Sequence, residues 1–224
     1  MPEADVRRSA ERFVSRAPGR ESRYSFSYAE HYDAANTHFG VLLAHNDETL
    51  DPGAGYDDHP HSQLEIVTWV LAGTLTHRDS TGADHAVPAG WVQVVSAGTG
   101  IRHSETNQHD EPVRYLQMWI APDGRGGGPT YQVHPLQTVG VASLHPPGQP
   151  GAQFSVVRPD QAGVTLPAAA YRHLFVAAGH VDVEGVGAFD AGDAVRFTEA
   201  NQDRVRGEPG SLIGIWAMRA ALGG

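Results

Sequence analysis

The sequence has no cysteine among its 224 residues. This absence excludes disulfides, thiolate nucleophiles, cysteine-ligated zinc and iron–sulfur clusters. Basic residues are also scarce, since 16 Lys and Arg stand against 26 Asp and Glu and give a formal net charge of −10. Nucleic acids and anionic membranes are bound through clustered Lys and Arg, so we expect neither as a partner.

Long apolar runs are missing as well. No run approaches the roughly 18 to 20 apolar residues that a helix needs to cross a bilayer. The first 23 residues mix arginines with glutamates and aspartates and contain no apolar core. They therefore do not read as a signal peptide, and a cytoplasmic location is the expectation.

Turn-forming residues are abundant instead. The 26 Gly and 15 Pro indicate many turns rather than long helices. Segments typical of strands lie between the turns, at 22–28, 41–44, 66–75, 91–96, 101–105 and 113–121. Residues 78–82 are expected to form a hairpin turn. Short strands at regular spacing predict an all-β sandwich or barrel.

The chain also shows a faint internal repeat. Glycine- and proline-rich stretches at 123–129 and 145–151 predict a boundary near residue 135, and the motif at 69–73 has an echo at 174–179. We therefore predict two related barrels in tandem, an N-terminal domain at 1–130 and a C-terminal domain at 131–224. The second half has no counterpart of the histidine pairs described next, so its barrel is expected to bind no metal.

Two pairs of candidate metal ligands occur at strand spacing. Residues i and i+2 of a strand point to the same face, so His59 and His61 aim at one point, as do His103 and Glu105. If the two strands cross inside a barrel, all four donors converge on one ion. A lone pair of this kind would be weak evidence in a chain with 13 histidines, but the second pair favours a metal site.

Imidazole and carboxylate donors without sulfur suit Fe(II), Mn, Ni, Cu(II) or Zn. Four protein ligands leave open positions on an ion that accepts five or six, as a catalytic metal requires. The remaining histidines lack a partner at ligand spacing, and His77, His85 and His109 are expected on exposed turns.

These motifs resemble the pirin family, a branch of the cupin superfamily. The matching segments are 26–28 (FSY), 46–48 (NDE), 52–55 (PGAG), 59–61 (HPH), 65–68 (EIVT), 77–80 (HRDS), 97–101 (AGTGI), 103–105 (HSE) and 117–119 (QMW). They cover most of residues 22–121, whereas the C-terminal half is similar mainly through Gly179 and 191–193.

The resemblance implies two tandem cupin barrels of jelly-roll type, the C-terminal one degenerate. The N-terminal barrel would hold one divalent metal, commonly iron, through His59, His61, His103 and Glu105. Glu65 shares strand parity with His61 and stands where ordinary cupins place their glutamate ligand. It is the alternative carboxylate, in which case Glu105 acts as the base.

The function that the resemblance implies is a dioxygenase of the quercetin 2,3-dioxygenase type. A monomer would act on a flavonol or similar polyphenol with dioxygen, with Glu105 as the catalytic base and Gln117 in the substrate pocket. A buried, hydrogen-bonded structural role is the alternative for Gln117. The alternatives for the whole protein are a non-catalytic metal-binding regulatory module and an enzyme with another substrate.

Overall fold

The computed structural model describes residues 4–136 and 141–223. In this part of the chain twenty-one strands form four sheets, and the helical structure is one short 3₁₀ turn, η1 (Ser9–Glu11). The prediction of an all-β chain is confirmed. None of the helical structure in the described residues is long and apolar enough to cross a membrane.

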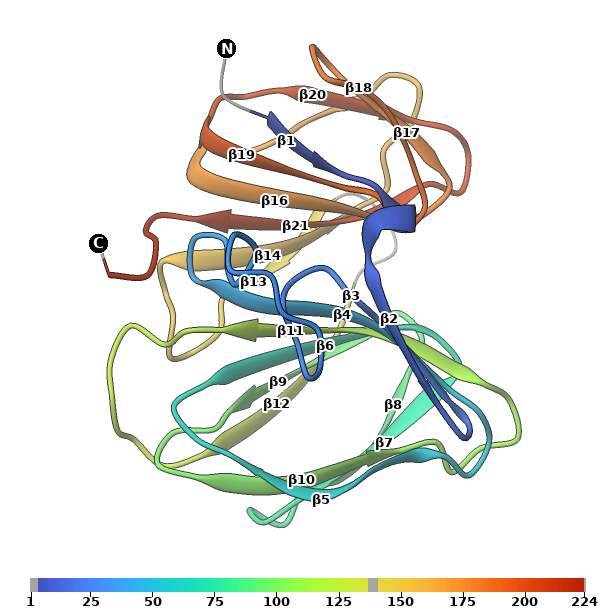
Figure 1. Cartoon of the computed structure of the whole chain (residues 1–224), viewed down its shortest axis with the longest axis vertical. Coiled ribbons are helices and arrows are strands. Elements are labelled where there is room, and N and C mark those ends of the chain that lie inside the picture. Colours follow the sequence, from blue (N-terminus) through green and yellow to red (C-terminus); the bar gives the residue numbers. More distant parts are fainter. Residues whose placement is uncertain (1–3, 137–140, 224) are drawn as a thin grey trace.

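Two sheets form the N-terminal barrel (Figure 1). The larger consists of β2 (Phe13–Ala17), β3 (Arg20–Tyr24), β4 (Leu42–Leu50), β6 (Glu65–Ala72), β9 (Trp91–Ser96), β11 (Val113–Ile120) and β12 (Thr130–Pro135). Its order is β12-β9-β6-β11-β4-β3-β2. The smaller consists of β5 (Gly55–His61), β7 (Thr74–Asp79), β8 (Asp84–Pro88) and β10 (Ile101–Thr106), in the order β5-β10-β7-β8.

The prediction of a single strand at 66–75 is wrong in one respect. The segment forms two strands that belong to different sheets. β6 ends at Ala72 and β7 begins at Thr74, with Gly73 between them at a φ of 70°. A Cβ at Gly73 would lie 2.5 Å from the carbonyl oxygen of Pro112. Only glycine fits both this left-handed conformation and this close approach, so the chain can turn there into the second sheet.

The C-terminal barrel has the same plan. Its six-stranded sheet consists of β1 (Ala4–Arg7), β13 (Val141–Leu144), β14 (Ala152–Val157), β16 (Ala169–Ala178), β19 (Ala194–Ala200) and β21 (Leu212–Met218), ordered β1-β19-β16-β21-β14-β13. Its four-stranded sheet consists of β15 (Val164–Thr165), β17 (His180–Val183), β18 (Gly187–Asp190) and β20 (Arg204–Gly207), ordered β15-β20-β17-β18.

The seven-stranded and six-stranded sheets pack face to face, and we call this interface the seam (Figure 1). In β6, Val67 and Trp69 face the seam and join a cluster that includes Phe154 and Trp216 of the second half. The alternate residues of β6 face the interior of the first barrel, as the period of two in a strand requires. The central strands β6, β9 and β11 of the seven-stranded sheet are therefore covered on both faces, which explains why most of their residues are apolar.

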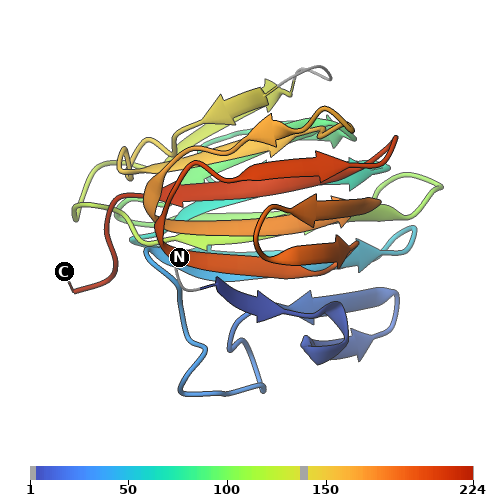
Figure 2. The ribbon, with the colours of Figure 1, turned by 90° about the horizontal axis from the view of Figure 1, so that it is seen from above.

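Strand pairing crosses the predicted boundary at residue 130 in both directions. β1 pairs with β19 of the second half, and β12 pairs with β9 of the first. Seen from above, the blue N-terminal segment lies along one edge of the stacked sheets (Figure 2). The division into 1–130 and 131–224 stays a prediction, and by strand pairing the first barrel continues through Pro135.

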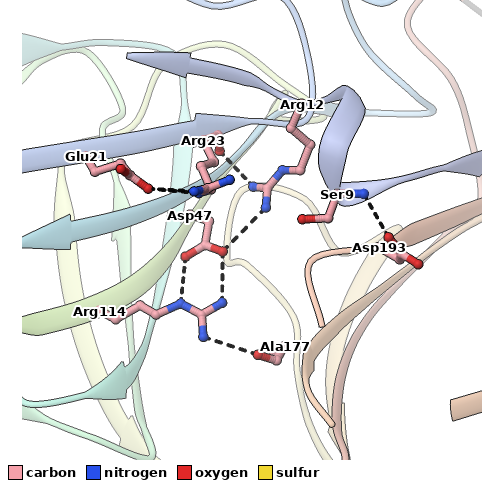
Figure 3. A network of polar contacts seen from close by, with 8 residues as sticks. All are labelled: Ser9, Arg12, Glu21, Arg23, Asp47, Arg114, Ala177 and Asp193. Atoms are coloured by element: carbon pink, nitrogen blue, oxygen red, sulfur yellow. Dashed lines mark hydrogen bonds and ion pairs between the residues drawn. The ribbon is translucent and has the colours of Figure 1, made fainter. Parts of the chain in front are cut away.

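Polar contacts also cross the seam (Figure 3). The Asp47 carboxylate, 7% exposed, accepts two hydrogen bonds of 2.9 Å from Arg114 and one of 3.4 Å from Arg12. Arg114 also donates to the carbonyl oxygen of Ala177 in the second half, at 3.3 Å. A bidentate guanidinium thus links a buried carboxylate of one half to the backbone of the other.

Candidate metal centre

Three histidines converge at the edge of the four-stranded sheet of the first barrel. His59 and His61 lie on β5, and His103 lies directly opposite His59 on β10. Their ring centroids are 4.4 Å apart for His59 and His103, 4.9 Å for His59 and His61, and 5.0 Å for His61 and His103. One ligand atom from each lies within 4.8 Å of the others, and we call this set the outer group.

The nitrogens of the outer group are available to a cation. The Nδ1–H of His59 donates to the carbonyl oxygen of Asp57 at 2.7 Å, which leaves the lone pair on Nε2. Burial, together with the neighbouring His103 and His59 rings, lowers the pKa of His61 to about 4. Burial also lowers the pKa of His103, although Glu105 opposes this shift. Both rings are therefore neutral at neutral pH, as metal ligation requires.

Several of these nitrogens have no other use. Among the described residues, Nε2 of His61 and both ring nitrogens of His103 are buried without a hydrogen-bond partner. Buried polar atoms are nearly always paired, so an orphaned cluster of this kind indicates a missing ligand. The donor set fits a divalent cation that accepts imidazole and oxygen ligands.

Glu105 lies beside this group but deeper in the barrel. The register of β10 against β5 shifts between His103 and Glu105, which marks a bulge, and Glu105 is 1% exposed. Its carboxylate accepts hydrogen bonds from Gln93 at 2.7 Å and from Gln117 at 2.5 Å, and a longer one from Thr68 at 3.5 Å. These donors from the opposite sheet fix its orientation.

The structure places Glu105 in a second set of donors rather than directly among the outer three. His77, His103 and Glu105 have ligand atoms within 4.8 Å of one another, and we call this set the inner group. The two groups share His103. The four predicted ligands are therefore divided between the two groups, which have His103 in common, and Glu105 lies deeper in the barrel than His59 and His61.

The prediction that His77 lies on an exposed turn is wrong. β7 continues to Asp79, so His77 is a strand residue, opposite Glu105 across the ladder and 0% exposed. Its Nε2–H donates to Asp79 Oδ2 at 2.9 Å, and both side chains are fully buried. The signal was present in the sequence, because His77 and Asp79 have the same spacing of two as the pairs that were recognised.

The structure gives Gln117 and Gln93 related positions. Gln117, predicted in the substrate pocket, donates to Glu105 and accepts a hydrogen bond of 3.2 Å from the indole nitrogen of Trp119. Contact with a substrate stays a prediction. Gln93 was missed, and its presence in an otherwise apolar strand was the available signal. It is 0% exposed and also accepts a hydrogen bond from the Tyr131 hydroxyl at 3.2 Å.

Glu65, the alternative carboxylate, faces away from the histidines. It shares the seam-facing side of β6 with Val67 and Trp69, whereas Thr68 points at Glu105. Its carboxylate accepts hydrogen bonds from Ser96 at 2.6 Å and from the backbone of Gly148 at 3.2 Å. Because consecutive strand residues face opposite sides, Glu65 is outside reach of the barrel interior.

The cluster is partly exposed to solvent at His59 and His61 and buried at His103 and Glu105. His59 and His61 are half-buried on the edge strand β5, whereas His103 and Glu105 are each 1% exposed. A cation held here would have protein donors behind it and solvent in front. Such an arrangement can take a small molecule on the open side and place a carboxylate within reach of its acidic proton.

Comparison with known proteins gives the same picture. The sequence model named Pirin matches residues 5–120. A protein of Mycobacterium tuberculosis, provisionally named a quercetin 2,3-dioxygenase, is 42% identical over 98% of this chain and 96% of its own length. A protein of Escherichia coli named quercetin 2,3-dioxygenase is 44% identical over 50% of this chain and 49% of its own length.

The fold has a solved counterpart. The crystal structure of the bacterial pirin YhhW from Escherichia coli in complex with nickel(II) has a TM-score of 0.91 and 28% identity, and the match covers 98% of this chain and 100% of that one. A family match over half the chain and a relative of 42% identity over nearly all of it agree. This chain belongs to the pirin family.

Proposed function

We propose that this protein is a metal-dependent dioxygenase of the quercetin 2,3-dioxygenase type. Its substrate would be a flavonol or a similar polyphenol with an acidic hydroxyl, and its cosubstrate dioxygen. The observation that carries the proposal is the cluster of orphaned, neutral imidazoles beside the oriented carboxylate of Glu105. The names of the relatives support it, since two of them refer to this reaction.

His59, His61, His103 and Glu105 would hold the metal, with iron(II) as the first expectation and nickel, manganese, copper and zinc as alternatives. When bound, the ion would lower the pKa of a coordinated hydroxyl and supply redox chemistry toward dioxygen. Because His59 and His61 are only half-buried, the ion would be accessible from solvent on this side. Trp119, whose ring lies 5.1 Å from that of His61, offers an aromatic wall at this side.

Glu105 would take the proton of the substrate hydroxyl. Its orientation is set before any substrate arrives, because Gln93 and Gln117 each donate to one of its oxygens. A carboxylate fixed in this way can accept a proton without the two side chains reorganising. Dioxygen would then add to the electron-rich ring of the substrate, with both oxygen atoms retained in the products.

The test is oxygen consumption with quercetin, on protein purified without chelators and assayed for bound metals. The wild-type chain should consume oxygen in proportion to its metal content. Glu105→Gln keeps the shape of the side chain but removes the base, so turnover should fall by about 100-fold or more, while metal content falls less than in His103→Ala.

Two results would contradict the proposal. Wild-type turnover in Glu105→Gln would remove the role of the base. A metal-loaded wild-type chain that consumes no oxygen with quercetin or other flavonols, yet binds a partner protein only in its metal-loaded form, would favour a regulatory role.

A further inference from the structure

The inner group contains a histidine that the proposed metal site does not use. His77 is fully buried, and its Nε2–H is committed to Asp79. Asp79 Oδ1 also accepts hydrogen bonds from the backbone and hydroxyl of Thr81, at 2.8 and 2.6 Å, and from the backbone of Ala83 at 3.2 Å.

This arrangement fixes the tautomer of His77. An ionised Asp79 only accepts hydrogen bonds, so the proton of a neutral His77 ring lies on Nε2 and the lone pair on Nδ1. Nδ1 is buried and, among the described residues, has no hydrogen-bond partner. A carboxylate that holds one imidazole nitrogen and leaves the other free is the usual support of a metal-binding histidine.

The surroundings of Nδ1 call for positive charge. In the inner group, one nitrogen of His77 lies within 4.8 Å of a nitrogen of His103 and of an oxygen of Glu105. Nε2 is already bonded to Asp79, so Nδ1 is the His77 nitrogen that a cation in this group would use. Glu105 only accepts from the amides of Gln93 and Gln117, so it offers Nδ1 no donor. His103 supplies at most one N–H, and neither of its nitrogens makes a hydrogen bond among the described residues. A buried lone pair left unpaired beside a carboxylate is costly, and a cation between them would satisfy both.

We propose that the first barrel provides two overlapping metal positions that share His103. The outer one uses His59 and His61, with Glu105 as the fourth donor of the proposed site, and the inner one uses His77 and Glu105. A neutral imidazole has one lone pair, so His103 serves one position at a time and the chain binds one ion. The outer position is half-open to solvent, and the inner one is enclosed. This inference rests on the proposed metal function and adds His77 to its donors.

Cobalt(II) is the probe, because its visible spectrum reports binding and coordination geometry without any turnover. The double variant His59→Ala/His61→Ala removes the outer donors. We expect it to bind one cobalt ion per chain, more weakly than the wild type and with a changed spectrum. Adding His77→Ala should abolish this residual binding to the level of His103→Ala.

A matched control separates ligation from packing. His77 and His85 stack on the Tyr131 ring, with centroids 4.5 and 5.0 Å away, but His85 is exposed and outside both groups. Adding His85→Ala to the double variant should leave its cobalt binding unchanged. Thermal unfolding of each metal-free variant checks that the fold is retained.

Asp79→Asn tests the same idea without removing a ligand. Three donors at Oδ1 would hold the amide oxygen there and turn the amide NH₂ toward His77, so that Nε2 becomes the acceptor and Nδ1 gains the proton. In the His59→Ala/His61→Ala background, cobalt affinity should fall about 10- to 100-fold. This variant keeps the proposal testable if His77→Ala does not fold.

The outcomes distinguish the two proposals. If the wild type binds cobalt but the double variant binds no more than His103→Ala, the inner position is overturned and the proposed function stands. The inner position is also overturned if adding His77→Ala or Asp79→Asn to the double variant leaves its cobalt affinity unchanged. A wild type that binds metal without turning over flavonols overturns the proposed function alone, and one that binds no metal overturns both.

Discussion

The two barrels have the same plan of sheets but opposite interiors. The interior of the C-terminal barrel is filled by apolar side chains: Val157, Leu166, Leu174, Val176, Val181, Val183, Phe189, Val195, Phe197, Ala200, Val205, Ile213 and Ile215. The N-terminal barrel keeps two smaller apolar clusters apart and encloses Glu105, His77, His103 and Gln93. The C-terminal barrel therefore has a continuous apolar core, whereas the interior of the N-terminal barrel is divided by a polar site.

This difference explains how the chain can tolerate a costly site. Unpaired buried nitrogens and carboxylates oppose folding, whereas the second barrel and the apolar seam favour it. The seven-stranded sheet connects the two, because one of its faces lines the site and the other packs on Phe154, Phe175 and Trp216. The second half thus supports the strands that carry Thr68, Gln93 and Gln117.

The largest effect is expected from a cavity in the second barrel. Leu174→Ala removes a side chain that is 0% exposed in β16, so it should lower the free energy of unfolding by about 2–5 kcal/mol. Chemical denaturation measures this loss. Cobalt binding in native buffer should stay at one ion per chain, and a variant that remains folded but loses metal would break the proposed division of roles.

The next effect is a pH dependence confined to the first barrel. Burial raises the pKa of Glu48 to about 7, well above the usual range of a glutamate, against hydrogen bonds from Ser22 and Tyr56. Below pH 4.5 the carboxyl is protonated in both states. As the pH rises toward 7 the unfolded chain ionises first, so this residue removes stability, by about 3 kcal/mol in all.

Glu48→Gln should remove this dependence. The variant should gain stability relative to the wild type between pH 5 and pH 8, measured by denaturation of both metal-free proteins at each pH. The other titrating groups are common to the two chains and cancel in the difference. A difference that is constant over this range, or that has the opposite sign, would contradict the assignment.

A smaller effect is expected at the seam. Arg114→Ala leaves the buried carboxylate of Asp47 with one long contact to Arg12 and frees the carbonyl of Ala177, at a cost of about 1–3 kcal/mol. Arg78→Ala, which breaks an exposed pair with Asp84, is the control and should cost about 0–1 kcal/mol. Equal losses in the two variants would show that the seam network contributes no more than a surface pair.

Much of the fold and part of the site could be predicted from the sequence. The period of two identified strands and placed His59, His61 and His103 on inward faces, because side-chain direction is a local property of a strand. The same rule failed for His77, since glycine and polar residues after it suggested that the strand had already ended. The same rule also could not place Glu65. Alternation along a strand shows which residues share a face, but not whether that face is turned to the barrel interior or to the seam.

Other features depend on long-range pairing. β1 joins the second barrel and β12 joins the first. Which sheet each strand joins depends on which sheet edges are still unpaired when the rest of the fold has formed. No local pattern records this choice. The separation of the donors into an outer and an inner group likewise follows from the bulge between His103 and Glu105, which the two-residue spacing of the motif does not reveal.

The most direct test of the account compares one buried histidine from each side of the seam. His103 belongs to both donor groups. His173 of β16, also buried and without a hydrogen-bond partner among the described residues, makes an edge-to-face contact with His45 at the seam. Metal content should be measured in both alanine variants after loading with iron(II) or cobalt(II). We expect His173→Ala to bind one ion per chain and His103→Ala to bind none. A folded His103→Ala chain that binds metal like the wild type would contradict the central claim.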